Sequence, residues 1–285
     1  MSAPLPSPSE TAPDKGLMTT RVEPERMSNA TANLVALQTI VRREIVRIMR
    51  IWTQTLIPPA ITMTLYFVIF GKLIGSRIGT IQGGYSYMQY IVPGLVMMSI
   101  ITNSYGNISS SFFGAKFSRA VEEMLVSPMP NWVILLGYVA GAVTRGLVVG
   151  VLVLLIALFF TSLHVAHPLV TFFSVLLGAT IFSLAGFVNA VYAKKFDDIA
   201  LVPTFVLTPL TYLGGVFYSV NMLAEPWQAI SRANPILYMV NAFRFGVLGI
   251  SDVNVGVAFV VMLAFVAGLS IVALQLLKRG VGLRS

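Results

Sequence analysis

The sequence contains no cysteine, only two histidines and little charge, and each shortage excludes a class of protein. Without cysteine there is no disulfide framework, no thiolate metal site and no cysteine nucleophile. Asp, Glu, Lys and Arg make up 11% of the 285 residues, whereas soluble domains carry roughly 25%. With 56% hydrophobic residues and a mean hydropathy of +0.82, the chain cannot cover a water-facing surface. The composition therefore predicts an integral membrane protein.

Motifs for catalysis and for energy coupling are also missing. No G-x-x-x-x-G-K-[ST] phosphate loop occurs, so the chain lacks that device for binding ATP. No H-E-x-x-H motif occurs, and His164 and His167 share one short turn without further ligands nearby, so we predict no metal site and no catalytic residue. The eleven acidic residues lie outside the long apolar runs, although an ion-coupled carrier usually needs an intramembrane carboxylate.

The N-terminal segment differs from everything that follows it. Residues 1–32 mix five prolines with Ser, Thr and charged residues, and they contain no apolar run of signal-peptide length. This composition predicts a disordered cytoplasmic tail that is not cleaved.

Residues 33–50 show helical periodicity, because apolar residues recur there at spacings of three and four. The apolar residues are Leu34, Leu37, Val41, Ile45 and Ile48. Arg43, Arg47 and Arg50 fall on the opposite side, where they would lie near lipid phosphates. We predict an amphipathic interface helix. It is either the charged start of the first span or a helix that also contacts a cytoplasmic partner.

Six apolar stretches are long enough to cross the membrane, which takes about 20 helical residues. They cover about residues 51–71, 87–113, 131–163, 169–192, 199–218 and 253–277. Residues 233–249 are also apolar, but Pro235 and Arg244 interrupt them, which favours a re-entrant hairpin over a seventh span. The predicted fold is an all-α integral membrane protein with six transmembrane helices.

The basic residues predict the orientation and account for the net charge of +8. Such a charge could indicate nucleic-acid binding, but these residues lie between apolar runs, so we predict no nucleic-acid partner. Four of the 19 lie on one side of the predicted spans: Lys72, Arg77, Arg232 and Arg244. Fourteen lie on the other side, with both termini. The positive-inside rule therefore puts both termini in the cytoplasm.

Arg145 is the one ionisable residue within a predicted span, and such a residue is a functional candidate by default. The 18 residues from Gly146 to Leu163 nearly cross the bilayer alone, at about 27 Å. Arg145 would then lie near the cytoplasmic boundary. Snorkelling, a structural pair and a role at the transport gate stay open.

The loop at residues 114–131 predicts a short amphipathic helix. Phe117, Val121 and Leu125 are spaced by four and would share an apolar face. The charged and terminating residues are Arg119, Glu122, Glu123 and Pro128. Because an acidic pair is unfavourable beside an anionic leaflet, docking onto a protein is favoured over lying on lipid.

The stretch at residues 207–249 predicts two half-helices that dip into the outer leaflet. Pro226 and Pro235 are well placed to start them. Arg244 would face phosphate, a carboxylate such as Glu225, or substrate, or it would serve only as a positional anchor.

From about residue 33 to its end, the chain resembles the type-2 ABC exporter permeases. In that family a loop with a charged pair before a Leu-rich stretch and a Pro forms the coupling helix, here residues 119–128. The family's late signature corresponds here to Gly214, Gly215, Pro226, Trp227, Asn234, Pro235 and Arg244.

The resemblance implies one half of an exporter in a bacterial inner membrane. Two copies would form a homodimer, and two copies of a cognate ABC ATPase would dock beneath the coupling helices. The ATPase would use ATP and Mg, this chain would bind no cofactor, and an amphiphilic or lipid-like substrate would move outward.

Three other functions are weighed against this one. A secondary, ion-coupled carrier needs intramembrane coupling groups or repeated halves, and a membrane-embedded transferase needs a catalytic cluster at one interface; neither is evident. A non-transporting scaffold would form a stable complex without stimulating an ATPase.

Overall fold

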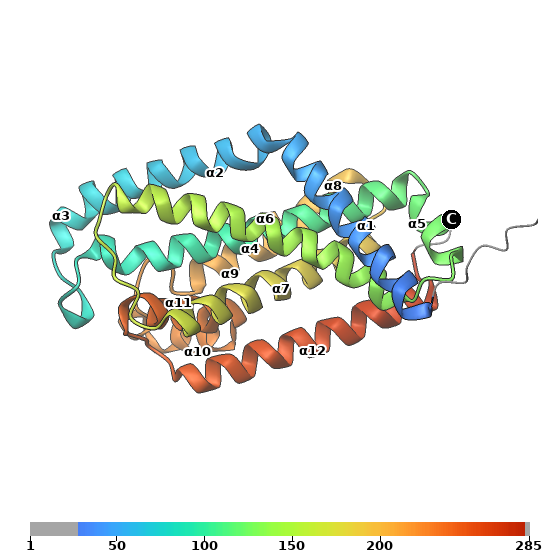
Figure 1. The fold of residues 1–285 in the computed structure, drawn as a ribbon. Helices are drawn as coiled ribbons and strands as arrows, with labels where there is room; N and C mark the ends of the chain where they lie inside the picture. The colour runs from blue at the N-terminus through green and yellow to red at the C-terminus, as the bar shows by residue number, and fades with distance from the viewer. Residues whose placement is uncertain (1–27, 283–285) are drawn as a thin grey trace, which may run out of the picture.

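The computed structural model describes residues 28–282, which form helices and loops without a β-strand in that range (Figure 1). The predicted tail lies mostly outside the described residues. The first part of the chain forms α1 (Asn29–Arg50), α2 (Trp52–Tyr66), η1 (Phe67–Ile74), α3 (Gly75–Ile78), η2 (Gln82–Gly84) and α4 (Tyr87–Phe117). The middle of the chain forms α5 (Ala120–Val126), α6 (Asn131–Leu158), α7 (Pro168–Tyr192), α8 (Phe196–Val202), η3 (Pro203–Leu207) and α9 (Thr208–Leu213). The last helices are η4 (Val220–Met222), α10 (Glu225–Ala233), α11 (Pro235–Leu248) and α12 (Val255–Arg279).

Among the described residues, five helical stretches are long and apolar enough to cross a membrane. They are Trp52–Ile78, Asn131–Leu158, Pro168–Tyr192, Phe196–Leu213 and Val255–Arg279. Each corresponds to a predicted span. The second and fourth of these stretches end earlier than predicted. The helix predicted to reach residue 163 ends at Leu158, and the one predicted to reach residue 218 ends at Leu213, before Gly215 with its φ of 71°.

The remaining predicted span, residues 87–113, lies within α4, which is the central helix of the bundle. Twenty of its 31 residues are buried, and it packs against α6, α7 and α11. At about 1.5 Å per residue it is about 46 Å long. Its many Ser, Thr and Asn residues lower its hydropathy. They are tolerated because neighbouring helices, rather than lipid, cover most of its surface.

Helix α1 begins at Asn29, four residues before the predicted start, because the Ser28 side chain accepts a hydrogen bond from the Thr31 amide and caps it. The helix crosses α6 at two glycines. A side chain at Gly137 would collide with Ile40, and one at Gly141 would collide with Glu44. The glycines therefore let the two helices approach closely, as small residues do between membrane helices.

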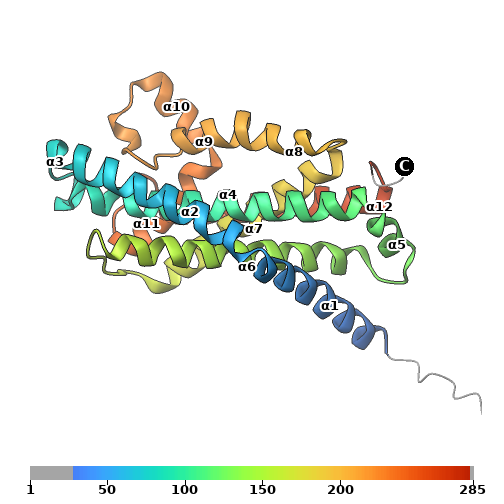
Figure 2. The ribbon, with the colours of Figure 1, turned by 90° about the horizontal axis from the view of Figure 1, so that it is seen from above.

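The two ends of the bundle carry different elements. In Figure 1, α5, the start of α1 and the end of α12 lie at one end, while α3, α10 and α11 lie at the other. Figure 2 shows the α8–η3–α9 stretch running along one side of the bundle, and α1 projecting obliquely from the opposite side. Loops and short helices thus gather at both ends of a bundle of long apolar helices.

Candidate functional site

A polar stripe follows the exposed side of α4. Thr102, Gly106 and Ser110 are spaced by four, so they share one helical face, and all three are exposed. Elsewhere the exposed surfaces of the long helices carry mainly large apolar side chains, as lipid contact requires. The stripe therefore lacks the large apolar side chains of the other exposed helix faces. Its two hydroxyls donate to carbonyls of α4, and their oxygens can still accept hydrogen bonds from water or a polar ligand.

A hollow of about 220 Å³ lies where α4 meets η3 and α9. Four threonines contribute to its lining: Thr102, Thr204, Thr208 and Thr211. Three of their hydroxyls donate to main-chain oxygens of their own segment at 2.7–2.9 Å. Their oxygen lone pairs remain able to accept hydrogen bonds from a ligand. The η3 segment has π-helical hydrogen bonding, a distortion that is frequent at functional sites.

The predicted coupling segment forms α5, but its apolar residues do not share one face. Arg119 has a φ of 61°, so the chain changes direction between α4 and α5 and the helical register is broken. Phe117 therefore belongs to α4, where its ring lies 5.4 Å from that of Phe196. Val121 is fully buried, and Leu125 packs partly against the same core. The prediction of a common docking face of Phe117, Val121 and Leu125 is wrong.

The surface that α5 does present consists of other residues. Val126 is 87% exposed, and Phe117 on the neighbouring end of α4 is 70% exposed. Glu123 and Pro128 are exposed, and Glu122 is half-buried. Glu122 and Glu123 lie in the first turn of α5, where a helix favours negative charge. The coupling role of this segment stays a prediction, with Val126 as its most exposed apolar residue.

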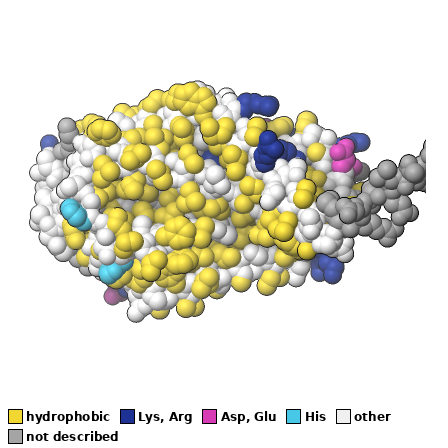
Figure 3. All heavy atoms as spheres, in the orientation of Figure 1, with side chains coloured by type: hydrophobic (Ala, Val, Ile, Leu, Met, Phe, Trp, Pro, Cys, Tyr) yellow, Lys and Arg dark blue, Asp and Glu magenta, His cyan; other side chains and the backbone are white. Residues whose placement is uncertain are grey.

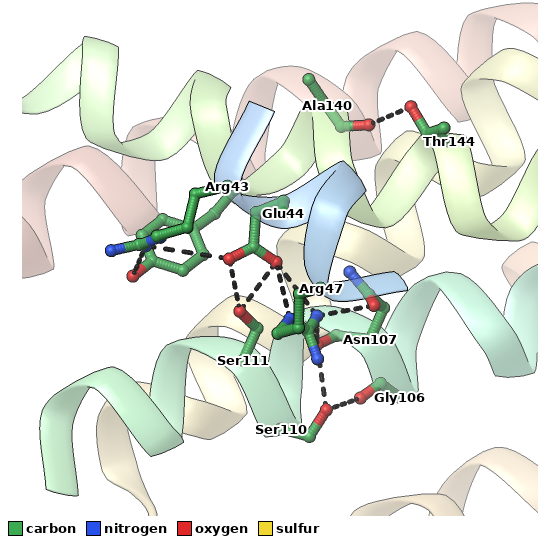
Figure 4. A network of polar contacts seen from close by, with 10 residues as sticks. Arg43, Glu44, Arg47, Gly106, Asn107, Ser110, Ser111, Ala140 and Thr144 are labelled. Carbon is green, nitrogen blue, oxygen red and sulfur yellow. Dashed lines mark hydrogen bonds and ion pairs between the residues drawn. The ribbon is translucent and has the colours of Figure 1, made fainter. Parts of the chain in front are cut away.

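Where α1 packs against α4 and α6, a buried carboxylate joins α1 to the bundle (Figure 4). Glu44 is 1% exposed and accepts hydrogen bonds from Ser111 on α4 at 2.7 Å and from Arg47 at 3.0 Å. Arg47 also donates to the Asn107 side chain on α4, at 2.7 Å. Arg43 donates to the Tyr138 hydroxyl on α6. Arg43 and Arg47, predicted to face lipid phosphates, thus each make contacts with the bundle as well, whereas Arg50 is exposed.

Arg145 lies half-buried on α6, one turn beyond Gly141 and close enough to Arg47 for their like charges to repel. Its Nε atom has no hydrogen-bond partner among the described residues, and neither has Asn107 Nδ2 or Ser104 Oγ on the adjacent α4. Arg145 makes no salt bridge in residues 28–282. Of the predicted alternatives for Arg145, a structural ion pair is therefore not formed, because no carboxylate among the described residues pairs with it.

Arg244 is buried at the opposite end of the bundle, with 1% exposure. Its guanidinium donates to the Gly215 carbonyl at 2.7 Å and lies over the Tyr90 ring, 3.9 Å from the centroid. Asp252 supplies a favourable charge nearby, and this carboxylate also accepts from Ser219 at 2.8 Å. Arg244 therefore contacts neither Glu225 nor the surface, and its contacts are those of a positional anchor.

The short helices around Arg244 begin where their prolines predicted. Pro226 lies in the first turn of α10, and Pro235 begins α11. Asn234 caps α11, because its side chain accepts from the Ile236 amide at 3.0 Å and donates to the Leu210 carbonyl. Trp227 is exposed on α10, as is Glu225. Eleven of the 14 residues of α11 are buried, so this helix is part of the bundle.

Sequence reasoning missed the buried acid Glu44, the stripe on α4 and Asp252. The spacing of Thr102, Gly106 and Ser110 was a readable signal, since small residues, two of them with hydroxyls, repeat every four positions within an apolar run. No comparable signal existed for Glu44, because its partner Ser111 is 67 residues away.

Residues 35–248 match the family described as ABC-2 type transporter. The chain is 58% identical to the inner membrane transport permease YadH of Escherichia coli K12 over 251 residues, which are 88% of this chain and 98% of the relative. It is 29% identical to nodulation protein J of Rhizobium meliloti over 198 residues, which are 67% of this chain and 73% of the relative.

Proposed function

The chain belongs to the ABC-2 type transporter family, and from that membership we propose that it is the membrane half of an ATP-driven exporter. Two copies form a homodimer, and each copy docks one cognate ATPase through the α5 surface. The ATPase hydrolyses ATP with Mg, and the membrane dimer moves an amphiphilic, lipid-like substrate outward from the cytoplasm or the inner leaflet.

We propose six spans in this assembly, with α4 as the sixth beside the five most apolar stretches. Both termini lie in the cytoplasm, in keeping with the distribution of basic residues. Helices α10 and α11 form an external re-entrant hairpin, since the 14 residues of α11 extend only about 21 Å, less than the roughly 30 Å of hydrocarbon.

The polar stripe on α4 is the observation that carries the export pathway. Thr102, Gly106 and Ser110 face away from the packed core of their own chain, and a second copy would enclose this face. The threonine hydroxyls of the adjoining hollow suit polar groups of a substrate, while Met98 and Leu207 in the same lining suit apolar ones. An amphiphile matches both.

A bulky residue in the stripe tests this pathway. Gly106→Trp should abolish export while membrane abundance and ATPase association stay at wild-type levels, because a Cβ atom added at Gly106 has no neighbouring atom within 4 Å outside its own helix backbone and points into open space. The measurement is accumulation of cell-envelope amphiphiles in a deletion strain that expresses each variant. Gly268→Trp on α12, where space is equally open, is the matched control. Wild-type export by Gly106→Trp would contradict the pathway.

A further inference from the structure

The exposed side of α1 carries more positive charge than the protein around it neutralises. Arg42, Arg43, Arg47 and Arg50 lie on one side of the helix, because their positions fall within about 140° of each other at 100° per residue. Glu44 is the only carboxylate that pairs with any of them in residues 28–282. Its oxygens are already bonded to Arg47 and Ser111.

Two of these arginines are free of partners. Arg42 and Arg50 are exposed and make no hydrogen bond or ion pair with any described residue. Arg43 and Arg47, by contrast, are held in place by Tyr138, Glu44 and Asn107. A fifth positive charge, that of Arg145 on α6, lies close enough to Arg47 for the two to repel each other. An anion bound from outside would relieve this imbalance.

The arginines line an open groove on the outer face of α1 that is large enough for a lipid head group. A concavity of about 510 Å³ is lined by the four arginines with Thr39 and Val46. Figure 3 shows Lys and Arg side chains, in dark blue, set into a largely hydrophobic surface at the part of the molecule where α1 lies. A negatively charged head group placed there would find several forked donors, which match phosphate geometry.

A second hollow adjoins the first and is apolar. It has a volume of about 360 Å³, and Arg42 and Val46 line both hollows. The aliphatic side chains of Leu37, Val41 and Ile45 supply most of the rest of its wall. Ile45 and Val46 are 38% and 49% exposed, so this side of α1 also suits hydrocarbon. A charged surface and an apolar surface are therefore adjacent, as the head group and acyl chain are in an amphiphile.

We propose that this side of α1 is a binding site for an acidic phospholipid. The phosphate lies in the hollow formed by Arg42, Arg43, Arg47 and Arg50, and an acyl chain lies along the apolar hollow. The occupant is a resident membrane lipid rather than the exported substrate, because α1 lies on the opposite side of the bundle from α8 and α9 (Figure 2), whereas the hollow of the proposed pathway is lined by α4, η3 and α9. Its assignment to the cytoplasmic leaflet rests on the proposed orientation.

Lipid binding to the purified full chain tests this site. Native mass spectrometry would count lipids retained after titration with phosphatidylglycerol or, separately, with phosphatidylcholine. We expect the wild type to prefer phosphatidylglycerol, and Arg42→Gln combined with Arg50→Gln to weaken that binding by about tenfold or more, since juxtamembrane basic residues attract acidic lipid individually. Raising the salt concentration should weaken it further.

Two further variants complete the design. Val46→Glu places a negative charge between the hollows and should abolish the preference without unfolding the chain, because the side chain is half exposed. Lys194→Gln combined with Lys195→Gln removes two exposed charges elsewhere and should bind phosphatidylglycerol as the wild type does.

Three results would overturn the proposal: equal binding of the two lipids by the wild type, undiminished binding by the double arginine variant, or a purified protein whose α1 site holds an amphiphile other than a phospholipid. The assay needs neither the ATPase nor transport. If the wild type binds both lipids equally but couples to its ATPase, only the lipid site is rejected. If it binds phosphatidylglycerol selectively but does not couple to an ATPase, only the exporter function is rejected.

Discussion

At the scale of single residues, Arg244 determines how the end of the bundle that carries α10 and α11 is held together. It joins α11 to the Gly215 turn and to the Tyr90 ring on α4. We expect Arg244→Ala to lower the free energy of unfolding by about 3 kcal/mol, because it removes a charged hydrogen bond and leaves a buried carbonyl without its donor. The measurement is thermal unfolding in detergent, at matched protein concentration.

Arg232→Ala is the control for that variant. Arg232 is exposed, and the hydrogen bond that its side chain donates, to Gln228, is long at 3.4 Å. Its loss should change stability by less than about 0.5 kcal/mol. Similar unfolding temperatures for the two variants would show that Arg244 is not an anchor.

Glu44 could not have been assigned its role from the sequence. The periodicity of residues 33–50 indicates an amphipathic helix, and the structure has one. However, the direction in which that helix packs depends on where Gly137 and Gly141 lie on α6, about 95 residues along the chain. That packing turns Glu44 inward, toward Ser111, and leaves Leu34 58% exposed.

At the scale of elements, the contact between α1 and α6 depends on close approach at Gly141. Gly141→Leu should push α1 away from α6 and disturb the Glu44 contacts, and overpacking of this kind typically costs about 1–3 kcal/mol. The readout is thermal unfolding together with protease sensitivity of α1. Gly268→Leu on α12 makes the same change in open space and should leave both unaltered.

For α5, the structure changes which residue should matter for docking. Val126 is the most exposed large apolar residue of the segment, whereas Val121 is buried in its own chain. We expect Val126→Asp to abolish co-purification of the ATPase, since truncation of a docking anchor alone typically costs about 2 kcal/mol or more. Glu123→Ala should have a smaller effect, mainly on the association rate.

Val165→Asp serves as the matched control for Val126→Asp. Val165 is 49% exposed in the loop between α6 and α7, at the opposite end of the bundle from α5. It should leave ATPase binding intact. If Val126→Asp also retains the ATPase at wild-type abundance, α5 is not the docking element.

The long helices were predictable from the sequence, and the breaks between them were less so. Apolar runs of about 20 residues leave little choice but to span or to be buried, so five predicted spans correspond to apolar helical stretches. The turn at Arg119 had no comparable signal, because a non-glycine residue with positive φ is not marked by its neighbours. That turn is the reason why the predicted face of α5 was wrong.

At the scale of the whole molecule, the orientation of the bundle is open to a direct test. With six spans and both termini in the cytoplasm, reporters fused at Ser76 and at His167 should read external, and one at Lys195 should read cytoplasmic. Alkaline phosphatase and fluorescent-protein fusions report the two sides. A cytoplasmic signal at His167 would contradict the hairpin of α6 and α7.

The central claim is that this chain is one half of a transporter whose energy comes from a separate subunit. The most direct test co-expresses it with its cognate ATPase and measures both the mass of the purified complex and its ATP hydrolysis. We expect two copies of each chain, hydrolysis by the complex, and none above background by this chain alone, because its sequence has no phosphate loop. Specific hydrolysis by the isolated chain, or no association with the ATPase, would contradict the account.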